Sequence, residues 1–190
     1  MKKTFAFISL FILAISIKVI AQNDTAGMKA WQDYMTPGDV HKMIAKYDGN
    51  WKEDVTFWMQ PGAPPTKTTS TSVTEMILGG RYQQSKTTGD MMGTPFEGFS
   101  LLGYDNMKKV FTSTWMDNFG TGTLTCEGTW DDATKTITFY GKEFDPMSNK
   151  EMSIKETLQF VDDDTQKFES YNESPKGEFK MMEITYTRVK

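Results

Sequence analysis

The stretch GNWKEDVTFWM, residues 49–59, marks the point at which the sequence changes its period. Within it Trp51, Val55 and Phe57 alternate with polar residues, and a period of two is typical of a half-buried β-strand. The same alternation continues through the rest of the chain. From this stretch onward the sequence therefore predicts strands and not helices.

Runs of this kind predict a series of strands separated by short turns rich in Gly, Pro, Asn and Asp. They cover residues 50–59, 66–78, 81–88, 96–104, 110–117, 121–130, 136–144, 151–161, 166–173 and 179–189. Turns this short join antiparallel neighbours, and an open sheet of that size would expose two edges. We therefore expect an all-β fold, an antiparallel up-and-down barrel of about eight to ten strands.

A short helix is predicted ahead of the first strand. Thr36-Pro37-Gly38-Asp39 is typical of a helix start, since Thr or Asp can cap the backbone and Pro is tolerated in the first turn. The residues that follow share one apolar face: Val40, Met43, Ile44 and Tyr47. We expect this helix to end at Asp48-Gly49.

Residues 1–21 have the pattern of a secretory signal peptide. Lys2 and Lys3 precede an apolar run over residues 5–20, and Ala21 supplies a small residue at the cut. The run is shorter than the roughly 20 apolar residues of a spanning helix, so we expect no membrane span in the mature chain. The expected domains are a signal peptide (1–21), an N-terminal extension (22–35) and a barrel domain (36–190). The expected location is periplasmic or secreted.

Charge and cysteine content narrow the function classes. Removing the three lysines of residues 1–21 takes the formal net charge from −4 to −7. An acidic chain lacks the basic patches that supply most nucleic-acid affinity, so no nucleic-acid partner is expected. Cys126 is the single cysteine, which excludes an intramolecular disulfide and favours a buried thiol.

Several charged residues fall on inward faces if the alternation is followed literally. Glu53, Glu75 and Glu156 then point into the barrel, as does Arg188, and Arg81 opens a strand after Gly79-Gly80. Buried charges are costly unless paired, so this pattern predicts internal ion pairs or a wet cavity. The alternative is that some of them face solvent through a bulge or a slip of register.

The sequence gives little support for a catalytic site or a metal-binding site. His41, the single histidine, falls on the predicted helix beside Lys42, and we expect it to be exposed. Two Asp-rich turns, at residues 130–135 and 161–167, could be imagined as calcium sites, but such turns commonly cap their own backbone. We therefore predict no catalytic residue, no metal site and no cofactor.

Two sets of motifs carry a family resemblance. Gly49-Asn50-Trp51 near the first strand and Arg188 near the last resemble the calycin signature, in which the Trp packs under the Arg and plugs one end of the barrel. A longer run resembles the bacterial family called domain of unknown function 1579. Its motifs are His41, Gly49-Asn50-Trp51, Thr56-Phe57-Trp58, Leu78-Gly79-Gly80-Arg81, Pro95-Phe96-Glu97-Gly98, Leu102-Gly103-Tyr104-Asp105-Asn106, Thr114-Trp115-Met116-Asp117, Gly120-Thr121 and Glu183-Ile184-Thr185-Tyr186-Thr187-Arg188.

That resemblance implies a calycin-type barrel, with Trp51 and Arg188 closing it, and transfers no catalytic residue. The similar haem-binding barrels of the nitrobindin type hold iron through a histidine inside the barrel. Since no predicted strand contains a histidine, the chain departs from that pattern.

Three functions remain open at this stage. The first is a barrel that binds a small apolar or amphipathic ligand, with candidate contact residues Trp58, Arg81, Tyr104, Trp115 and Glu156. In this hypothesis Arg81 is the candidate anchor for an acidic head group. The second is an isomerase-like or cyclase-like enzyme that uses inward carboxylates. The third is a structural or interaction module of the cell envelope that docks a protein partner through Trp31 and Tyr34.

Overall fold

The computed structural model describes residues 25–146, 148–174 and 177–190, so the predicted signal peptide lies outside the described residues. Residues 25–35 are helical and belong to a compact unit separate from residues 37–190. In that helix Trp31 and Tyr34 are exposed. Across the described residues, no helix combines the length and apolar character needed to cross a membrane.

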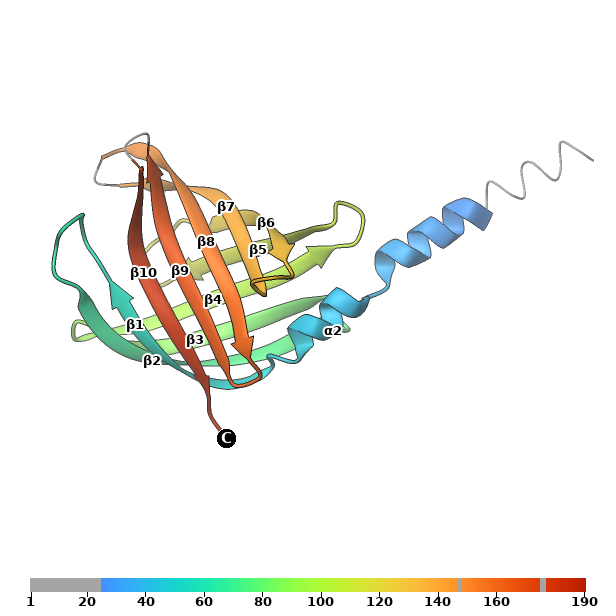
Figure 1. Ribbon diagram of the computed structural model, residues 1–190, viewed down its shortest axis with the longest axis horizontal. Helices are drawn as coiled ribbons and strands as arrows, with labels where there is room; N and C mark the ends of the chain where they lie inside the picture. The colour runs from blue at the N-terminus through green and yellow to red at the C-terminus, as the bar shows by residue number, and fades with distance from the viewer. Residues whose placement is uncertain (1–24, 147, 175–176) are drawn as a thin grey trace, which may run out of the picture. The chain divides into compact units, whose positions relative to one another are not determined.

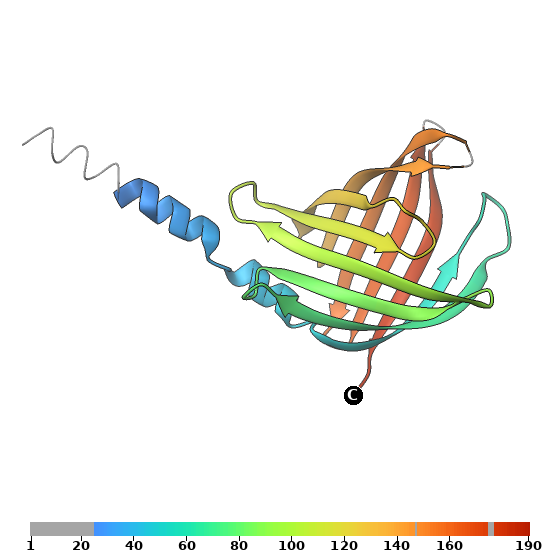
Figure 2. The ribbon, with the colours of Figure 1, turned by 180° about the vertical axis from the view of Figure 1, so that it is seen from behind.

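Residues 37–190 form a closed antiparallel barrel preceded by helix α2 (Asp39–Ala45) (Figure 1). The strands are β1 (Gly49–Phe57), β2 (Thr66–Ile77), β3 (Tyr82–Met91), β4 (Thr94–Asp105), β5 (Val110–Asp117), β6 (Leu124–Asp131), β7 (Thr136–Asp145), β8 (Lys150–Asp162), β9 (Thr165–Ser174) and β10 (Gly177–Arg188). Each strand pairs with its sequence neighbours, and β1 also pairs with β10. Figure 2 shows the far wall, in which β2 to β5 lie side by side.

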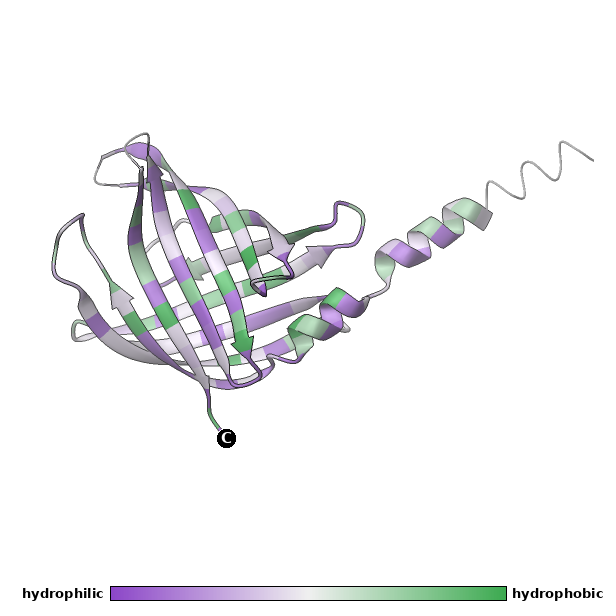
Figure 3. Cartoon of the chain, in the orientation of Figure 1, coloured by the Kyte–Doolittle hydropathy of each residue, from purple (hydrophilic) through white to green (hydrophobic). Residues whose placement is uncertain are grey.

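The predicted up-and-down barrel is confirmed, and the predicted strands match the observed ones to within a few residues. Hydrophilic and hydrophobic residues alternate along the strands (Figure 3). The end of β3 and the start of β6 differ most, and β6 starts late because the segment before it is a turn built on Asp117. The Oδ1 atom of Asp117 accepts hydrogen bonds from the N–H groups of Phe119 and Gly120, at 2.9 and 3.2 Å.

The face predicted for β2 is wrong. The apolar residue Val73 is 53% exposed, and Glu75 lies on the outer surface, where the side-chain amide of Gln84 donates to it at 2.6 Å. Ser70 and Ser72 point inward instead, since they lie opposite the inward-facing Glu53 and Trp51 of β1. Residues directly opposite on paired strands share a face, so the neighbouring strand decided the register.

Helix α2 covers one end of the barrel, and the expectation of an exposed His41 is wrong. The imidazole is only 5% exposed, lies edge-on to the ring of Tyr104, and accepts a hydrogen bond at Nδ1 from the N–H of Gly38 at 3.1 Å. Burial lowers the pKa of His41, and a hydrogen bond with the backbone of Tyr104 opposes this only in part. Ile44 of α2 is buried in the hydrophobic core together with Trp51 and Phe111.

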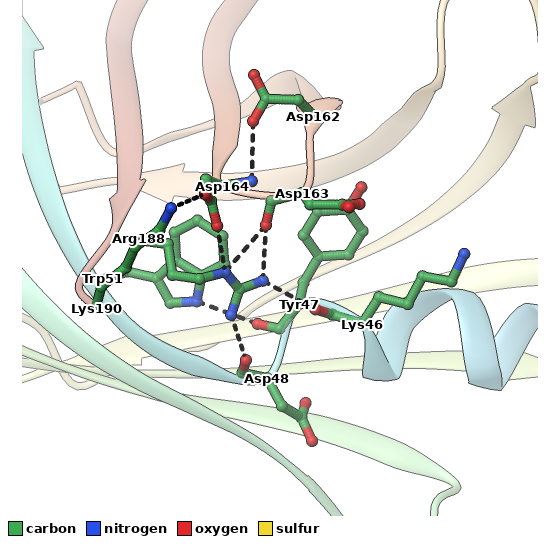
Figure 4. Close-up of polar contacts among 9 residues, drawn as sticks. All are labelled: Lys46, Tyr47, Asp48, Trp51, Asp162, Asp163, Asp164, Arg188 and Lys190. Carbon is green, nitrogen blue, oxygen red and sulfur yellow. Dashed lines mark hydrogen bonds and ion pairs between the residues drawn. The ribbon is translucent and has the colours of Figure 1, made fainter.

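The covered end is closed by Arg188 (Figure 4). Its guanidinium carbon lies 4.4 Å from the centre of the Trp51 ring, within the range of a cation–π contact. Nη1 donates to the carbonyl of Asp48 at 2.6 Å, and Nη2 donates to the carbonyls of Lys46 and Asp163 at 2.9 and 2.8 Å. One side chain thereby joins β10, the end of α2, the β8–β9 turn and the first residues of β1.

Two residues of the Gly49-Asn50-Trp51 motif have separate roles in this closure. The indole N–H of Trp51 donates to the carbonyl of Tyr47 at 3.1 Å. Gly49 has a φ of +141°, and a β-carbon there would lie 2.7 Å from Nη1 of Arg188. A side chain at Gly49 would therefore displace the guanidinium.

We expect Arg188→Ala to lower the free energy of unfolding by about 2–4 kcal/mol, because it leaves three carbonyls without their donor and uncovers the indole. Arg188→Lys should recover little of this loss, since an ammonium group cannot reproduce the planar fork. Urea denaturation followed by tryptophan fluorescence measures both variants.

Lys190→Ala is the matched control for this experiment. It removes an exposed ion pair with Asp164, and we expect a change of less than about 0.5 kcal/mol. Equal stabilities for Arg188→Ala and Lys190→Ala would show that the guanidinium does not hold this end closed.

Candidate functional site

A cavity of about 490 Å³ occupies the barrel interior. It extends from Trp51 at the covered end to Asp90, Phe119 and Glu143, which are exposed near the opposite end. Pockets of about 300–1,000 Å³ accommodate small organic molecules. The interior is therefore large enough for a ligand.

The two sides of the cavity differ in chemistry. Hydroxyl and amide side chains on β2 and β3 form a polar wall: Thr68, Ser70, Thr74, Gln83, Ser85 and Thr87. The facing wall, from β4 to β10, also contains polar residues such as Ser113, Glu156 and Ser170, but it carries most of the large apolar side chains: Phe96, Trp115, Leu124, Phe139, Leu158, Phe168, Met182 and Ile184. The cavity is thus amphipathic.

Glu53 of β1 lies in the depth of this cavity. Its side chain is 3% exposed and accepts hydrogen bonds from the hydroxyls of Ser70 and Thr87, at 2.5 and 3.3 Å. Two neighbouring strands of the polar wall therefore hold this carboxylate in place. Its burial is compensated by hydrogen bonds rather than by an ion pair.

Glu156 of β8 is buried without such compensation. It is 7% exposed, it lines the cavity, and no hydrogen bond to its carboxyl group comes from the described part of the chain. Burial raises its pKa to about 7, with a further contribution from Glu143. The pKa of Glu143 is raised in turn, first because the surrounding protein removes part of the water around its carboxyl group and then by Asp117 and Asp145.

Tyr186 of β10 lies within electrostatic range of both buried carboxyl groups. It lies opposite Glu53 in the β1–β10 pair and lines the cavity. Its pKa is raised well above the ordinary value, first by burial and then by Glu53 and Glu156. A phenol that keeps its proton remains available as a hydrogen-bond donor in the cavity.

The candidate ligand residues occupy different parts of the barrel. Trp115 and Glu156 line the cavity. Arg81 lies in the β2–β3 turn at the covered end, is exposed, and donates to the carbonyl of Leu78 at 3.1 Å. Trp58 is half-buried just after β1, and Tyr104 packs on Phe111 beside His41, with ring centres 4.9 Å apart.

Arg81, Trp58 and Tyr104 are not among the described residues that line the cavity. The structure adds the Ser and Thr residues of the polar wall, together with Glu143 and Tyr186. A signal for the polar wall is present in the sequence, since Thr66 to Thr74 contains Ser or Thr at every second position.

Within the described residues, no cluster of three or more His, Cys, Asp or Glu side chains is placed to hold a metal ion. Haem bound through an internal histidine does not fit this cavity, because His41, the single histidine, lies on α2 and does not line it. Cys126 is buried, and burial is the main cause that raises its pKa to about 12, which disfavours the reactive thiolate form.

The Asp-rich turns use their carboxylates locally. Oδ1 of Asp131 accepts from the N–H of Ala133 at 2.8 Å, and Oδ1 of Asp162 accepts from the N–H of Asp164 at 2.8 Å. These contacts are the self-capping expected of short acidic hairpin turns.

Comparison with known proteins agrees with this architecture. The family model described as "Protein of unknown function (DUF1579)" matches residues 36–188. The chain belongs to this family. The match spans α2 and the barrel, so the family model covers the same part of the chain as the fold described above.

Two solved structures are similar in fold. Rv2717c from M. tuberculosis matches with a TM-score of 0.58 and 12% identity, over 82% of this chain and 100% of that one. The S-type phycobiliprotein lyase CPES from Guillardia theta matches with a TM-score of 0.56 and 12% identity, over 83% and 96%. Identities this low establish the fold alone. No curated protein matches the sequence.

Glu156 gives the protein a specific dependence of stability on pH. The unfolded carboxyl group loses its proton near the ordinary value of 4.5, whereas the folded one keeps it up to about 7. Between these values the folded state binds more protons, so the free energy of unfolding falls as pH rises. We expect a loss of about 2–4 kcal/mol from this group, complete above its folded pKa.

Urea denaturation at about pH 5 and about pH 8 tests this expectation, because Glu156→Gln should lack that component of the loss. Glu151→Gln, an exposed change on the same strand, should behave as the wild type does. The same pH dependence in all three proteins would contradict the assignment to Glu156.

Proposed function

We propose that this protein is an exported carrier that binds one small amphipathic molecule inside its barrel. The observation that carries the proposal is the cavity itself, which is open near one end and has a polar wall facing a largely apolar wall. A ligand with an apolar body and one polar edge would satisfy both walls at once. Export is proposed from the signal-peptide pattern of residues 1–21.

Burial supplies the driving force for such binding. Aromatic and aliphatic side chains along β4 to β10 offer surface that favours an apolar group over water, at about 25 cal/mol for each Å² removed from solvent. Hydroxyl groups along β2 and β3 then determine the orientation of the bound ligand. The fold shared with a phycobiliprotein lyase is compatible with this use of the barrel.

Titration with the neutral fluorophore N-phenyl-1-naphthylamine tests the proposal. We expect saturable enhancement of its fluorescence by the wild type. Ser113→Phe, which places a ring in the cavity, should weaken binding at least about tenfold. Thr114→Phe places the same ring at the next residue of β5, which does not line the cavity, and should bind as the wild type does.

Circular dichroism of both variants is the check that they remain folded. Equal affinity of Ser113→Phe and Thr114→Phe for the fluorophore would place its binding outside the cavity and contradict the proposal. Failure of the wild type to bind the fluorophore at all would do the same.

A second candidate function follows from Glu156. A carboxyl group with a pKa of about 7 at a cavity wall is suited to donate and accept protons near neutral pH. Tyr186, which lies in the field of both Glu53 and Glu156, provides a second proton donor. An isomerase-like or cyclase-like reaction on a bound molecule requires groups of this kind.

Incubation with a small-molecule extract, followed by mass spectrometry, tests catalysis. We expect that a compound consumed by the wild type and by Glu151→Gln is left intact by Glu156→Gln, with a rate lower by about a hundredfold or more. A rate that survives in Glu156→Gln would remove Glu156 from the chemistry and leave the carrier function alone.

A further inference from the structure

The residues that line the cavity carry charge of one sign. In the described part of the chain, none of them is Lys, Arg or His. The acidic ones are Glu53, Asp90, Asp117, Glu143 and Glu156. Charges inside a cavity with apolar walls act over longer distances than charges in water. The interior therefore favours a cation and opposes an anion.

Two of these carboxylates are already used by the protein itself. Asp117 accepts from the indole N–H of Trp115 at 2.9 Å as well as from its own turn. Asp90 accepts from the N–H of Gly93 at 2.6 Å in the β3–β4 turn. These contacts give Asp90 and Asp117 structural roles near the open end.

Glu156 has no comparable role. It is buried, and its neighbours across the sheet are Phe139 on β7 and Ser170 on β9. No residue in the described part of the chain donates a hydrogen bond to its carboxyl group, and the negative charge of Glu143 repels the ionised form of Glu156. A buried carboxyl group without a partner destabilises the folded state, and a cation bound beside it would remove that cost.

We propose that the ligand of the barrel is an organic cation, in which an amine on an apolar body binds with its ammonium group at Glu156, while Glu53 adds to the negative charge of the cavity. This inference rests on the proposed carrier function and specifies its ligand class. The ammonium group would supply the hydrogen-bond donors that Glu156 lacks. Aromatic rings that line the same cavity, Trp115, Phe139 and Tyr186, would receive the apolar body and add cation–π contacts.

The proposal predicts a dependence of affinity on pH. The titratable groups around Glu156 are Glu143 from β7, Cys126 from β6 and Tyr186 from β10, while β9 contributes the uncharged Ser170. Tyr186 is also influenced by Glu53 of β1. None of these groups carries a positive charge. As pH rises through about 7, Glu156 loses its proton, whereas an alkyl ammonium keeps its own to about pH 10. Amine affinity should therefore rise over this interval.

Three ligands of nearly equal size test the inference: tryptamine, tryptophol and indole-3-acetate. They share an indole and differ in bearing an ammonium, a hydroxyl or a carboxylate. Each is titrated against the full mature chain loaded with N-phenyl-1-naphthylamine, at about pH 6 and about pH 8. We expect tryptamine to bind at least about tenfold more tightly than tryptophol at the higher pH, and indole-3-acetate to bind least.

Glu156→Gln should abolish the preference for tryptamine and its pH dependence, while leaving the affinity for tryptophol within about twofold. Glu53→Gln is a second variant, which keeps an acceptor for Ser70 and Thr87 and should weaken tryptamine binding alone. Glu151→Gln should match the wild type in every titration.

The outcomes distinguish a failure of the cationic ligand from a failure of the carrier function. A wild type that binds the fluorophore but prefers tryptophol or indole-3-acetate to tryptamine overturns the cationic ligand and leaves the carrier function standing. A preference for tryptamine that survives in Glu156→Gln also overturns it. A wild type that does not bind the fluorophore overturns both.

Discussion

Arg188 joins the last strand to the first, and the interior of the barrel depends on that contact. Its guanidinium covers Trp51 and satisfies the carbonyls of Lys46, Asp48 and Asp163, which would otherwise lie exposed at the end of the barrel. With one end closed by this contact and by α2, the other strands can surround a hollow without a fully packed core. The closure stabilises a barrel whose interior has room for a ligand.

The sequence predicted the barrel well because its strands are separated by strong turn signals and lack helical periodicity. It failed where the pattern was least apolar. In β2 only Val73, Met76 and Ile77 are apolar, and an alternation read from Val73 places the wrong face inward. Cross-strand pairing with Trp51 and Glu53 decides that face, and pairing between strands is not contained in one segment.

The candidate site was predictable only in part for a related reason. Inward carboxylates at Glu53 and Glu156 follow from alternation alone, but their different surroundings do not. Glu53 meets hydroxyl groups from β2 and β3, whereas Glu156 lies beside Phe139 and Ser170. Arg81 seemed suited to a ligand because of its charge, yet its turn places it at the covered end, away from the cavity. Helix α2 likewise buries His41 by tertiary packing that its own sequence does not reveal.

The contact that closes the barrel also bears on how the chain folds. Arg188 reaches carbonyls that lie 140 and 142 residues earlier, so the two ends of the barrel must meet across nearly the whole domain. Hairpins between sequence neighbours can form early, but joining the first strand to the last carries the largest loop-closure entropy. Until that step, β1 and β10 remain as unpaired edges that other chains can join. The interval before ring closure is therefore the stage at which this protein is most exposed to aggregation.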